Sequence, residues 1–332
     1  MTAILQPAIT DPALTPDQLA AIVRHAFGPR ATLVEAVPVG GGTVNEVWRL
    51  RVAGERDVIL RVAPSPEAAA RGASWLTPDG LRREQAAIAL LPSLATILPD
   101  TVRFEGSRAI VDRDWVVQTI VPGRPWSEVD ATLDDATRRG LWRQMGAICR
   151  AIHEVPGPAF GPAHDPVFPT WAGLLLDDAR GLLDDAVRFG LDAGPFQRLL
   201  AALEADRALL DRVTAPALIH SDLGPRHCFV ESDADGAWRI VGLIDLEFAR
   251  FADPMSESTI VGFALLPPDV RLCEAFWTGY GPLGTPPGRE RRATLYAAIA
   301  LGWIATDLAR LGLPDDVAGV LAQMTGRLDA LG

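Results

Sequence analysis

The chain has 332 residues, of which 48% are hydrophobic and 22% are charged, a balance that indicates a folded globular protein rather than a disordered one. The formal net charge is −11. Because nucleic acids are bound by clustered cationic side chains, this acidic balance argues against a nucleic-acid partner. The sequence has no run of about 18 apolar residues, so no membrane span is expected.

Cysteine and lysine usage adds two constraints. The three cysteines, Cys149, Cys228 and Cys273, are widely spaced and form no sequence pattern typical of a zinc site. Together with an N-terminus that lacks the basic head and apolar core of a signal peptide, they favour free thiols in a reducing cytoplasm. All 31 basic residues are arginine, so any role that lysine usually fills falls to arginine or is vacant.

The first third of the chain predicts a mostly antiparallel sheet with one internal helix. A first helix is expected to begin at Thr15, in a capping box with Gln18, and to end at Gly28. Apolar runs bounded by glycine-rich or charged turns then indicate strands and hairpins. The expected strands are 31–39, 43–52, 57–62, 101–104, 109–111 and 115–121, and the internal helix is expected over 80–91.

The character of the chain changes after Pro122. Apolar residues at helical spacing predict a helix over 133–155, and a loop rich in proline and glycine follows. Further helices are expected over 171–189 and 195–212, and most of the C-terminal region is also helical. We therefore expect an α+β fold with an antiparallel-sheet N-terminal lobe, residues 1–121, and a mainly helical C-terminal lobe. That second lobe spans residues 122–332, with a helical insertion at about 160–212.

Two stretches, 219–228 and 240–257, carry the strongest functional pattern. Asp222 follows a short apolar strand and a histidine, His227 comes five residues later, and Asp245 ends a second apolar strand. This is the order of a kinase catalytic loop and its metal-binding strand. It resembles the aminoglycoside phosphotransferase family, which includes macrolide and hygromycin phosphotransferases and has the bilobal protein-kinase-like fold.

The resemblance implies the chemistry of the C-terminal lobe. Asp222 is expected to accept the proton of the acceptor hydroxyl, and His227 and Asp245 are expected to hold Mg²⁺. The family usually has Asn where this chain has His227, although macrolide phosphotransferases are similar to this chain in carrying His. Because Mg²⁺ prefers oxygen, an alternative is that His227 only orders the loop and Asp245 holds the metal nearly alone.

The resemblance also implies that the N-terminal lobe binds the nucleotide. Arg61 stands where the family usually has the lysine that contacts the α- and β-phosphates, and Glu84 stands where the helix supplies its ion-pair partner. The alternatives are an outward-facing strand residue and a solvated helix face. The other implied nucleotide contacts are a glycine-rich loop with Gly41, Gly42 and Thr43, an adenine hinge with Gln118 and Ile120, and a γ-phosphate contact from Arg226.

The remaining features concern the support of the site and its acceptor. Asp253 and Glu257 lie in an Asp-Pro-x-x-Glu segment similar to one that braces the catalytic loop in the family. Acidic helix residues would suit an amine-bearing acceptor, and tryptophans would suit a more apolar one, but such residues also serve as solvated faces and as core. The candidates are Asp177, Asp178, Asp184, Asp185, Glu274, Asp307, Asp315 and Asp316, and Trp171, Trp277 and Trp303.

The function implied is transfer of the γ-phosphate of ATP, with Mg²⁺, to a hydroxyl group of a small molecule, an antibiotic of the aminoglycoside or macrolide type. A metabolic kinase for an amino alcohol or sugar and a catalytically inactive nucleotide-binding protein are the alternatives. A hydrolase that uses Asp222 and His220 is excluded, because the chain has no nucleophile elbow. The acceptor, the choice between ATP and GTP and the oligomeric state stay open.

Overall fold

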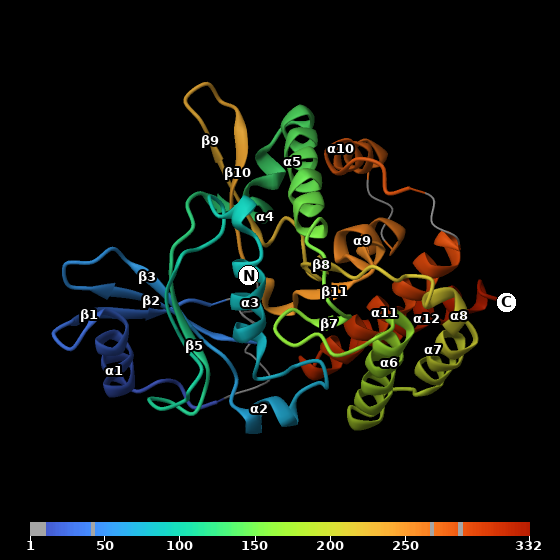
Figure 1. Cartoon of the computed structure of the whole chain (residues 1–332), viewed down its shortest axis with the longest axis horizontal. Coiled ribbons are helices and arrows are strands. Elements are labelled where there is room, and N and C mark those ends of the chain that lie inside the picture. The colour runs from blue at the N-terminus through green and yellow to red at the C-terminus, as the bar shows by residue number, and fades with distance from the viewer. Residues whose placement is uncertain (1–10, 41–43, 266–268, 285–287) are drawn as a thin grey trace.

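The computed structural model describes residues 11–40, 44–265, 269–284 and 288–332. Figure 1 shows a sheet-rich N-terminal part beside a helix-rich C-terminal part. The predicted glycine-rich contacts Gly41, Gly42 and Thr43 lie outside the described residues. Within them, no helix is both long and apolar enough to cross a membrane.

The first helix follows its predicted capping signals. Helix α1 (Pro16–Phe27) begins after Thr15, whose hydroxyl accepts from the backbone N–H of Gln18 at 3.3 Å. The Gln18 side chain accepts in return from the backbone N–H of Thr15 at 2.9 Å, which completes the capping box. Gly28, at φ 107°, ends the helix. The buried face of α1 then packs against the N-terminal sheet.

The N-terminal sheet has five antiparallel strands in the order β1-β2-β3-β5-β4. The middle strand is β3, and Arg61 on it pairs with Val47 on one side and Val116 on the other. Helix α3, which carries Glu84, packs beside the sheet (Figure 1). The elements are β1 (Leu33–Pro38), β2 (Glu46–Val52), β3 (Val58–Val62), β4 (Thr101–Glu105), β5 (Trp115–Thr119), α2 (Pro66–Arg71), α3 (Gly80–Ala89) and the short 3₁₀ helix η1 (Pro92–Leu94).

The strand predicted at 109–111 is wrong, because residues 106–114 form a loop. Arg108 has a left-handed φ of 59°, which interrupts any extended run. The fully buried carboxylate of Asp114 accepts from Arg82 at 2.6 Å and from Arg108 at 2.9 Å, and so holds the loop in place. Val111 still joins the core under the sheet, so its apolar character reflects burial rather than a strand.

Gly123 marks the point where the chain leaves the N-terminal sheet. Its φ is +84°, and a Cβ there would lie 2.7 Å from the carbonyl oxygen of Val230, so only glycine fits. The next strand, β6 (Arg124–Pro125), pairs with β9 (Cys228–Ser232) of the C-terminal part. The lobe boundary at residue 121 stays a prediction, and this change of sheet supports it.

Two small antiparallel sheets carry the predicted catalytic segments. One has the order β10-β9-β6 and the other β7-β11-β8. Strand β8 leads into the segment with Asp222, and β10 leads into the one with Asp245. The strands not yet given are β7 (Gly161–Pro162), β8 (Ala217–Ile219), β10 (Trp238–Leu243) and β11 (Arg250–Ala252).

Helices form the rest of the C-terminal part around two hydrophobic cores. The helix predicted over 195–212 is two helices, α7 and α8, which meet at Asp206. The helices are α4 (Trp126–Val129), α5 (Asp135–His153), α6 (Trp171–Arg188), α7 (Gly194–Ala205), α8 (Arg207–Leu210), α9 (Ser258–Leu265), α10 (Val270–Tyr280), α11 (Arg289–Arg310) and α12 (Pro314–Asp329). The 3₁₀ helices of this part are η2 (Asp130–Thr132), η3 (Leu246–Phe248) and η4 (Pro254–Ser256).

Helices α5 and α10 cross at a contact made by two glycines. A Cβ on Gly279 would lie 1.9 Å from the carbonyl oxygen of Arg143, and a Cβ on Gly146 would lie 2.1 Å from that of Phe276. Backbone atoms of a helix cannot move aside as a flexible side chain does. The close crossing therefore depends on the absence of both side chains.

We expect Gly279→Ala to lower the free energy of unfolding by about 3 kcal/mol or more, because the new methyl group overlaps the backbone of α5. The matched control is Gly140→Ala, on α5 with nothing within 4 Å of its Cβ, which should be neutral or stabilising by up to about 1 kcal/mol. Urea unfolding measures both. Equal stability of the two variants would contradict the close crossing.

Candidate active site

A buried guanidinium lies at the centre of the candidate site. Nη1 of Arg61, on β3, donates to both carboxylate oxygens of Glu84 on α3, at 2.7 and 2.5 Å. Its Nη2 donates to Asp245 Oδ1 at 2.8 Å and to Glu247 Oε2 at 3.3 Å. Arg61 and Glu84 are 7% and 1% exposed, so neither is the solvent-facing residue of the alternative interpretation. The structure brings the proposed cation, its helical partner and the proposed metal ligand together.

This cluster holds more acids than cations. Burial raises the pKa of Glu84, and burial together with Asp245 raises the pKa of Glu247 to about 8. Burial opposes the charge of Arg61, but Glu84, Asp245 and Glu247 together outweigh it and raise the pKa of Arg61. The raised pKa values of Glu84 and Glu247 reflect burial and the crowding of three carboxyl groups around one guanidinium, and a further cation at the same place would stabilise their ionised forms.

The segment that carries Asp222 is anchored by a buried histidine. The backbone N–H of Asp222 donates to His220 Nδ1 at 3.3 Å, so Nε2 carries the ring proton and donates to the carbonyl oxygen of Ile244 at 3.1 Å. Burial lowers the pKa of His220, which agrees with a neutral ring. Ser221, between the two, has a φ of 71°. His220 thus joins the loop after β8 to the end of β10.

Asp222 faces Arg226 across one turn. Nη2 of Arg226 donates to the two carboxylate oxygens of Asp222 at 2.6 and 2.8 Å. The Arg226 side chain is 67% exposed and that of Asp222 is 31% exposed, so solvent screens the pair and it contributes at most about 1 kcal/mol. An anion bound beside Arg226 can therefore replace Asp222 as its partner at little cost.

His227 lies between the two acidic residues. Its Nδ1 lies 2.6 Å from the carbonyl oxygen of Asp222, which can only accept, so Nδ1 carries a proton. Its Nε2 lies 3.2 Å from Asp245 Oδ2. When the His227 ring is neutral, Nε2 and Asp245 Oδ2 are both hydrogen-bond acceptors. A cation between these two atoms would stabilise their close approach. Burial opposes the charge of Asp245, but Arg61 and His227 lower its pKa below the usual value.

The donor set of His227 and Asp245 is therefore compatible with a divalent cation. Asp245 has a left-handed φ of 73°, which directs the backbone out of β10 at this residue. Two polar atoms, Oδ1 of Asn45, whose amide group contacts Glu247, and Oγ of Ser221, next to Asp222, are buried without a hydrogen-bond partner among the described residues. Such orphaned atoms are typical of a site that binds a polar ligand.

The proposed adenine hinge follows β5. Gln118 is still part of the sheet, paired with Ile59, and its Oε1 is buried without a partner in the described segments. Ile120 lies just beyond the strand, and its side chain is 42% exposed. No described residue hydrogen-bonds to the backbone of Ile120 or Val121. Their N–H and C=O groups are thus free for a planar hydrogen-bonding ligand.

Glu257 and Asp253 accept hydrogen bonds near the segment that carries Asp222. The backbone N–H of His220 donates to Glu257 Oε2 at 2.8 Å, and that of Ser258 donates to Oε1 at 2.9 Å. Asp253 accepts from Arg292 at 2.8 Å and from Tyr296 at 2.6 Å. Glu257 thus contacts the loop that carries Asp222, whereas Asp253 contacts α11.

Several of the residues proposed to bind the phosphate-accepting substrate are instead engaged in contacts within the protein. Asp178 pairs with Arg250 at 2.8 Å, and fully buried Asp185 accepts from the backbone and hydroxyl of Ser74. Trp171 is fully buried in the C-terminal core. Trp277 and Trp303 are partly buried and pack against the two cores. These residues do not form a free acidic or aromatic wall.

Two residues of the cluster were not predicted. Glu247 accepts a hydrogen bond from Asn45 Nδ2 as well as from Arg61. A signal for Glu247 was available, because it is an acid within an apolar run, and a buried acid needs a partner. Asn45 offers no such signal, since its partner lies 202 residues away.

Comparison with known proteins concerns the family and the fold of the chain. A family model described as the phosphotransferase enzyme family matches residues 35–295. The GDP complex of wild-type aminoglycoside 2′-phosphotransferase-IIIa is similar, with 18% identity, coverage of 96% of this chain and 99% of that chain, and a TM-score of 0.64. A ternary complex of a thermostable aminoglycoside phosphotransferase APH(4)-Ia mutant with AMP-PNP and hygromycin B also has 18% identity. It covers 95% of this chain and 97% of its own, with a TM-score of 0.62.

At these identities the solved structures show the fold, and the predicted bilobal kinase-like α+β fold is confirmed. No curated protein sequence matches the chain.

The buried charge of Glu257 makes a stability prediction that depends on pH. Burial alone would raise its pKa, but His153 and the N–H of His220 outweigh burial and lower the pKa from 4.5 to about 2. The ionised form therefore stabilises the fold above pH 4.5, and this contribution is lost as the pH falls toward 2. By linkage, the shift corresponds to about 3 kcal/mol at pH 7.

We expect Glu257→Gln to lower the free energy of unfolding by about 3 kcal/mol at pH 6, and by about 1 kcal/mol less at pH 4. Urea unfolding at the two pH values measures the difference. Glu154→Gln, at a neighbouring carboxylate whose side chain is 62% exposed, is the control and should change stability by less than about 0.5 kcal/mol. An unchanged difference between the two pH values would show that Glu257 is not a low-pKa anion.

Proposed function

The chain belongs to the phosphotransferase enzyme family, and from this we propose that it transfers the γ-phosphate of ATP to a hydroxyl group of a small molecule. The observation that carries the proposal is the convergence of residues from three distant segments. Arg61 contacts Asp245, His227 contacts Asp245, and the same imidazole contacts the backbone of Asp222. Phosphoryl transfer requires a phosphate-binding cation, a metal site and a base close together.

Arg61 and the hinge are the proposed nucleotide contacts. Glu84 holds the guanidinium of Arg61 in place, so that its Nη2 is free to exchange Asp245 for the α- and β-phosphates. The free backbone groups at Ile120 suit the edge of the adenine ring, with Gln118 beside them. Arg226, exposed and weakly paired, is the proposed contact to the γ-phosphate.

His227 and Asp245 are the proposed ligands of Mg²⁺. The bond from Nδ1 to the Asp222 carbonyl fixes the ring so that Nε2 faces Asp245. When bound, Mg²⁺ would neutralise charge on the phosphates. Its presence would also compensate the excess of carboxylates around Arg61.

Asp222 is the proposed base. When a phosphate takes over Arg226, the Asp222 carboxylate becomes free to accept the proton of the acceptor hydroxyl as the oxygen attacks phosphorus. The backbone bond to His220 and the contact with His227 orient the residue. The roles of the base and the γ-phosphate contact are thus coupled through one ion pair.

For the acceptor we propose an antibiotic of the aminoglycoside or macrolide type, acted on in the cytoplasm. The solved relatives were captured with hygromycin B and with kanamycin, which supports an amine-bearing polyol. A metabolic amino alcohol or sugar is the alternative acceptor. The retention of both Asp222 and Asp245 supports activity over an inactive nucleotide-binding role, which the unusual Arg61 and His227 would otherwise suggest.

We expect release of ADP from MgATP with at least one compound in a panel of aminoglycosides, macrolides and amino alcohols. Asp222→Asn should lower that rate by about 10²- to 10⁴-fold while nucleotide affinity does not fall, because the substitution removes the proton acceptor and also the carboxylate that competes with phosphate for Arg226. A coupled ADP-release assay and a nucleotide titration measure the two quantities. Asp235→Asn, at an exposed turn between β9 and β10, is the control and should keep full activity.

The outcomes separate the alternatives. An Asp222→Asn enzyme with the wild-type rate would contradict the role of the base. Nucleotide binding without turnover of any compound would favour the inactive protein, and absence of nucleotide binding would contradict the whole assignment.

A further inference from the structure

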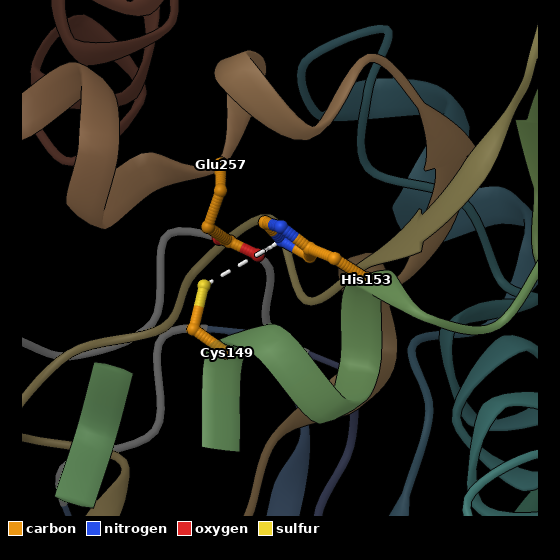
Figure 2. A group of neighbouring side chains, drawn as sticks. All are labelled: Cys149, His153 and Glu257. Atoms are coloured by element: carbon orange, nitrogen blue, oxygen red, sulfur yellow. Dashed lines mark hydrogen bonds and ion pairs between the residues drawn. The ribbon is translucent and has the colours of Figure 1, made fainter. Parts of the chain in front are cut away.

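A second cluster of chemically reactive side chains lies beneath the catalytic segment. Cys149 and His153 stand one turn apart at the end of α5, and Glu257 follows η4. Figure 2 shows the thiol, the imidazole and the carboxylate directed toward one another. All three residues are buried. The proposed phosphotransfer chemistry uses none of the three side chains directly.

Two of the three distances between ligand atoms in this cluster match those of a tetrahedral metal site, and all three atoms lie within 4.8 Å of one another. Cys149 Sγ lies 3.6 Å from His153 Nε2, and Nε2 lies 3.5 Å from Glu257 Oε2. Ligand bonds of about 2.3 Å to sulfur and about 2.0–2.1 Å to nitrogen and oxygen give tetrahedral edges of about 3.6 and 3.4 Å. An N–H···O hydrogen bond is normally about 2.9 Å, so the imidazole–carboxylate contact is long for a direct bond.

The ligand atoms are already oriented. His153 Nδ1 lies 2.8 Å from the hydroxyl of Tyr280, which can accept its proton, and the proton that Nε2 holds toward Glu257 in the metal-free protein would be released as Nε2 binds the metal. Glu257 Oε2 accepts from the backbone of His220, and a carboxylate oxygen has a second lone pair for a metal. Outer contacts of this kind are typical of metal ligands.

We propose that Cys149, His153 and Glu257 form a Zn²⁺ site that braces the catalytic loop. The thiol proton of Cys149 is released to solvent as the sulfur binds the metal, so that one thiolate, one carboxylate and the divalent ion give a neutral buried group. A thiolate with an imidazole selects Zn²⁺ over Mg²⁺, which takes oxygen ligands. Because Glu257 also holds His220, the metal would fix the backbone that precedes Asp222.

A cavity approaches the proposed site from the Tyr280 side of His153. It has a volume of about 430 Å³ and is lined by His153, Tyr280 and residues of the surrounding loops. Two of its three lining arginines, Arg150 and Arg292, are paired with the lining acids Glu154 and Asp253, which limits the positive charge that an entering metal ion would meet. A water molecule would complete three protein ligands to four, as at other zinc sites with an open position.

The test is a cobalt titration of metal-stripped protein in excess Mg²⁺, which occupies the proposed site at Asp245. We expect one equivalent of Co²⁺ to give the near-ultraviolet thiolate charge-transfer band and the visible bands of a tetrahedral site, and one equivalent of Zn²⁺ to abolish them. Neither His227 nor Asp245 supplies sulfur, so the charge-transfer band reports a cysteine ligand. If the wild-type protein gives a weak octahedral spectrum with no sulfur band, that result by itself overturns the proposal.

Variants assign the band to this cluster. Cys149→Ala should abolish the band and the rise in melting temperature that Zn²⁺ produces, whereas Cys273→Ala, at a half-buried thiol on α10, should retain both. Tyr280→Phe keeps every ligand but removes the partner of His153, and it should weaken Zn²⁺ binding by about 10- to 100-fold. Unchanged Zn²⁺ affinity in Cys149→Ala would overturn the assignment, and so would unchanged affinity in Tyr280→Phe if Cys149→Ala fails to fold.

Discussion

The buried guanidinium of Arg61 is the interaction on which the site depends. It joins β3 and α3 of the N-terminal sheet region to Asp245 and Glu247, which lie 184 and 186 residues further along the chain. A buried cation without these acids, or the acids without the cation, would cost several kcal/mol. The ion cluster therefore fixes how the two parts meet, and it leaves more carboxyl groups than cations where the proposed metal would bind.

The catalytic segment is held by backbone contacts rather than by its own sequence preferences. Ser221 and Asp245 both adopt left-handed φ values, which are unfavourable for side chains of their type and persist only where the surroundings impose them. His220 connects the two bends through Ile244, and Glu257 holds His220 from below. The proposed zinc site would extend this series of contacts to Cys149 and His153 on α5. The position of Asp222 would then depend also on α5.

Residue spacing, together with the family resemblance, indicated from the sequence which residues would lie close together in the candidate site. The separation of Asp222 from His227, and the acid at the end of β10, pointed to the same place as Arg61 and Glu84, and the contacts bring these residues together. The strand expected at 109–111 failed because apolar residues there are buried by a loop that Asp114 anchors. Contacts that depend on packing between distant segments leave no local pattern. The link from Asn45 to Glu247 and the meeting of Cys149 with Glu257 belong to this class.

The measurement that tests the central claim most directly is nucleotide affinity in Arg61→Gln. Glutamine can still hydrogen-bond but loses the charge that would bind the α- and β-phosphates. The account predicts that calorimetric titration will show an affinity for MgATP reduced by about tenfold or more, and an affinity for adenosine that is unchanged. If MgATP affinity is unchanged, or if adenosine affinity falls equally, Arg61 is not the phosphate-binding cation and the proposed site is wrong.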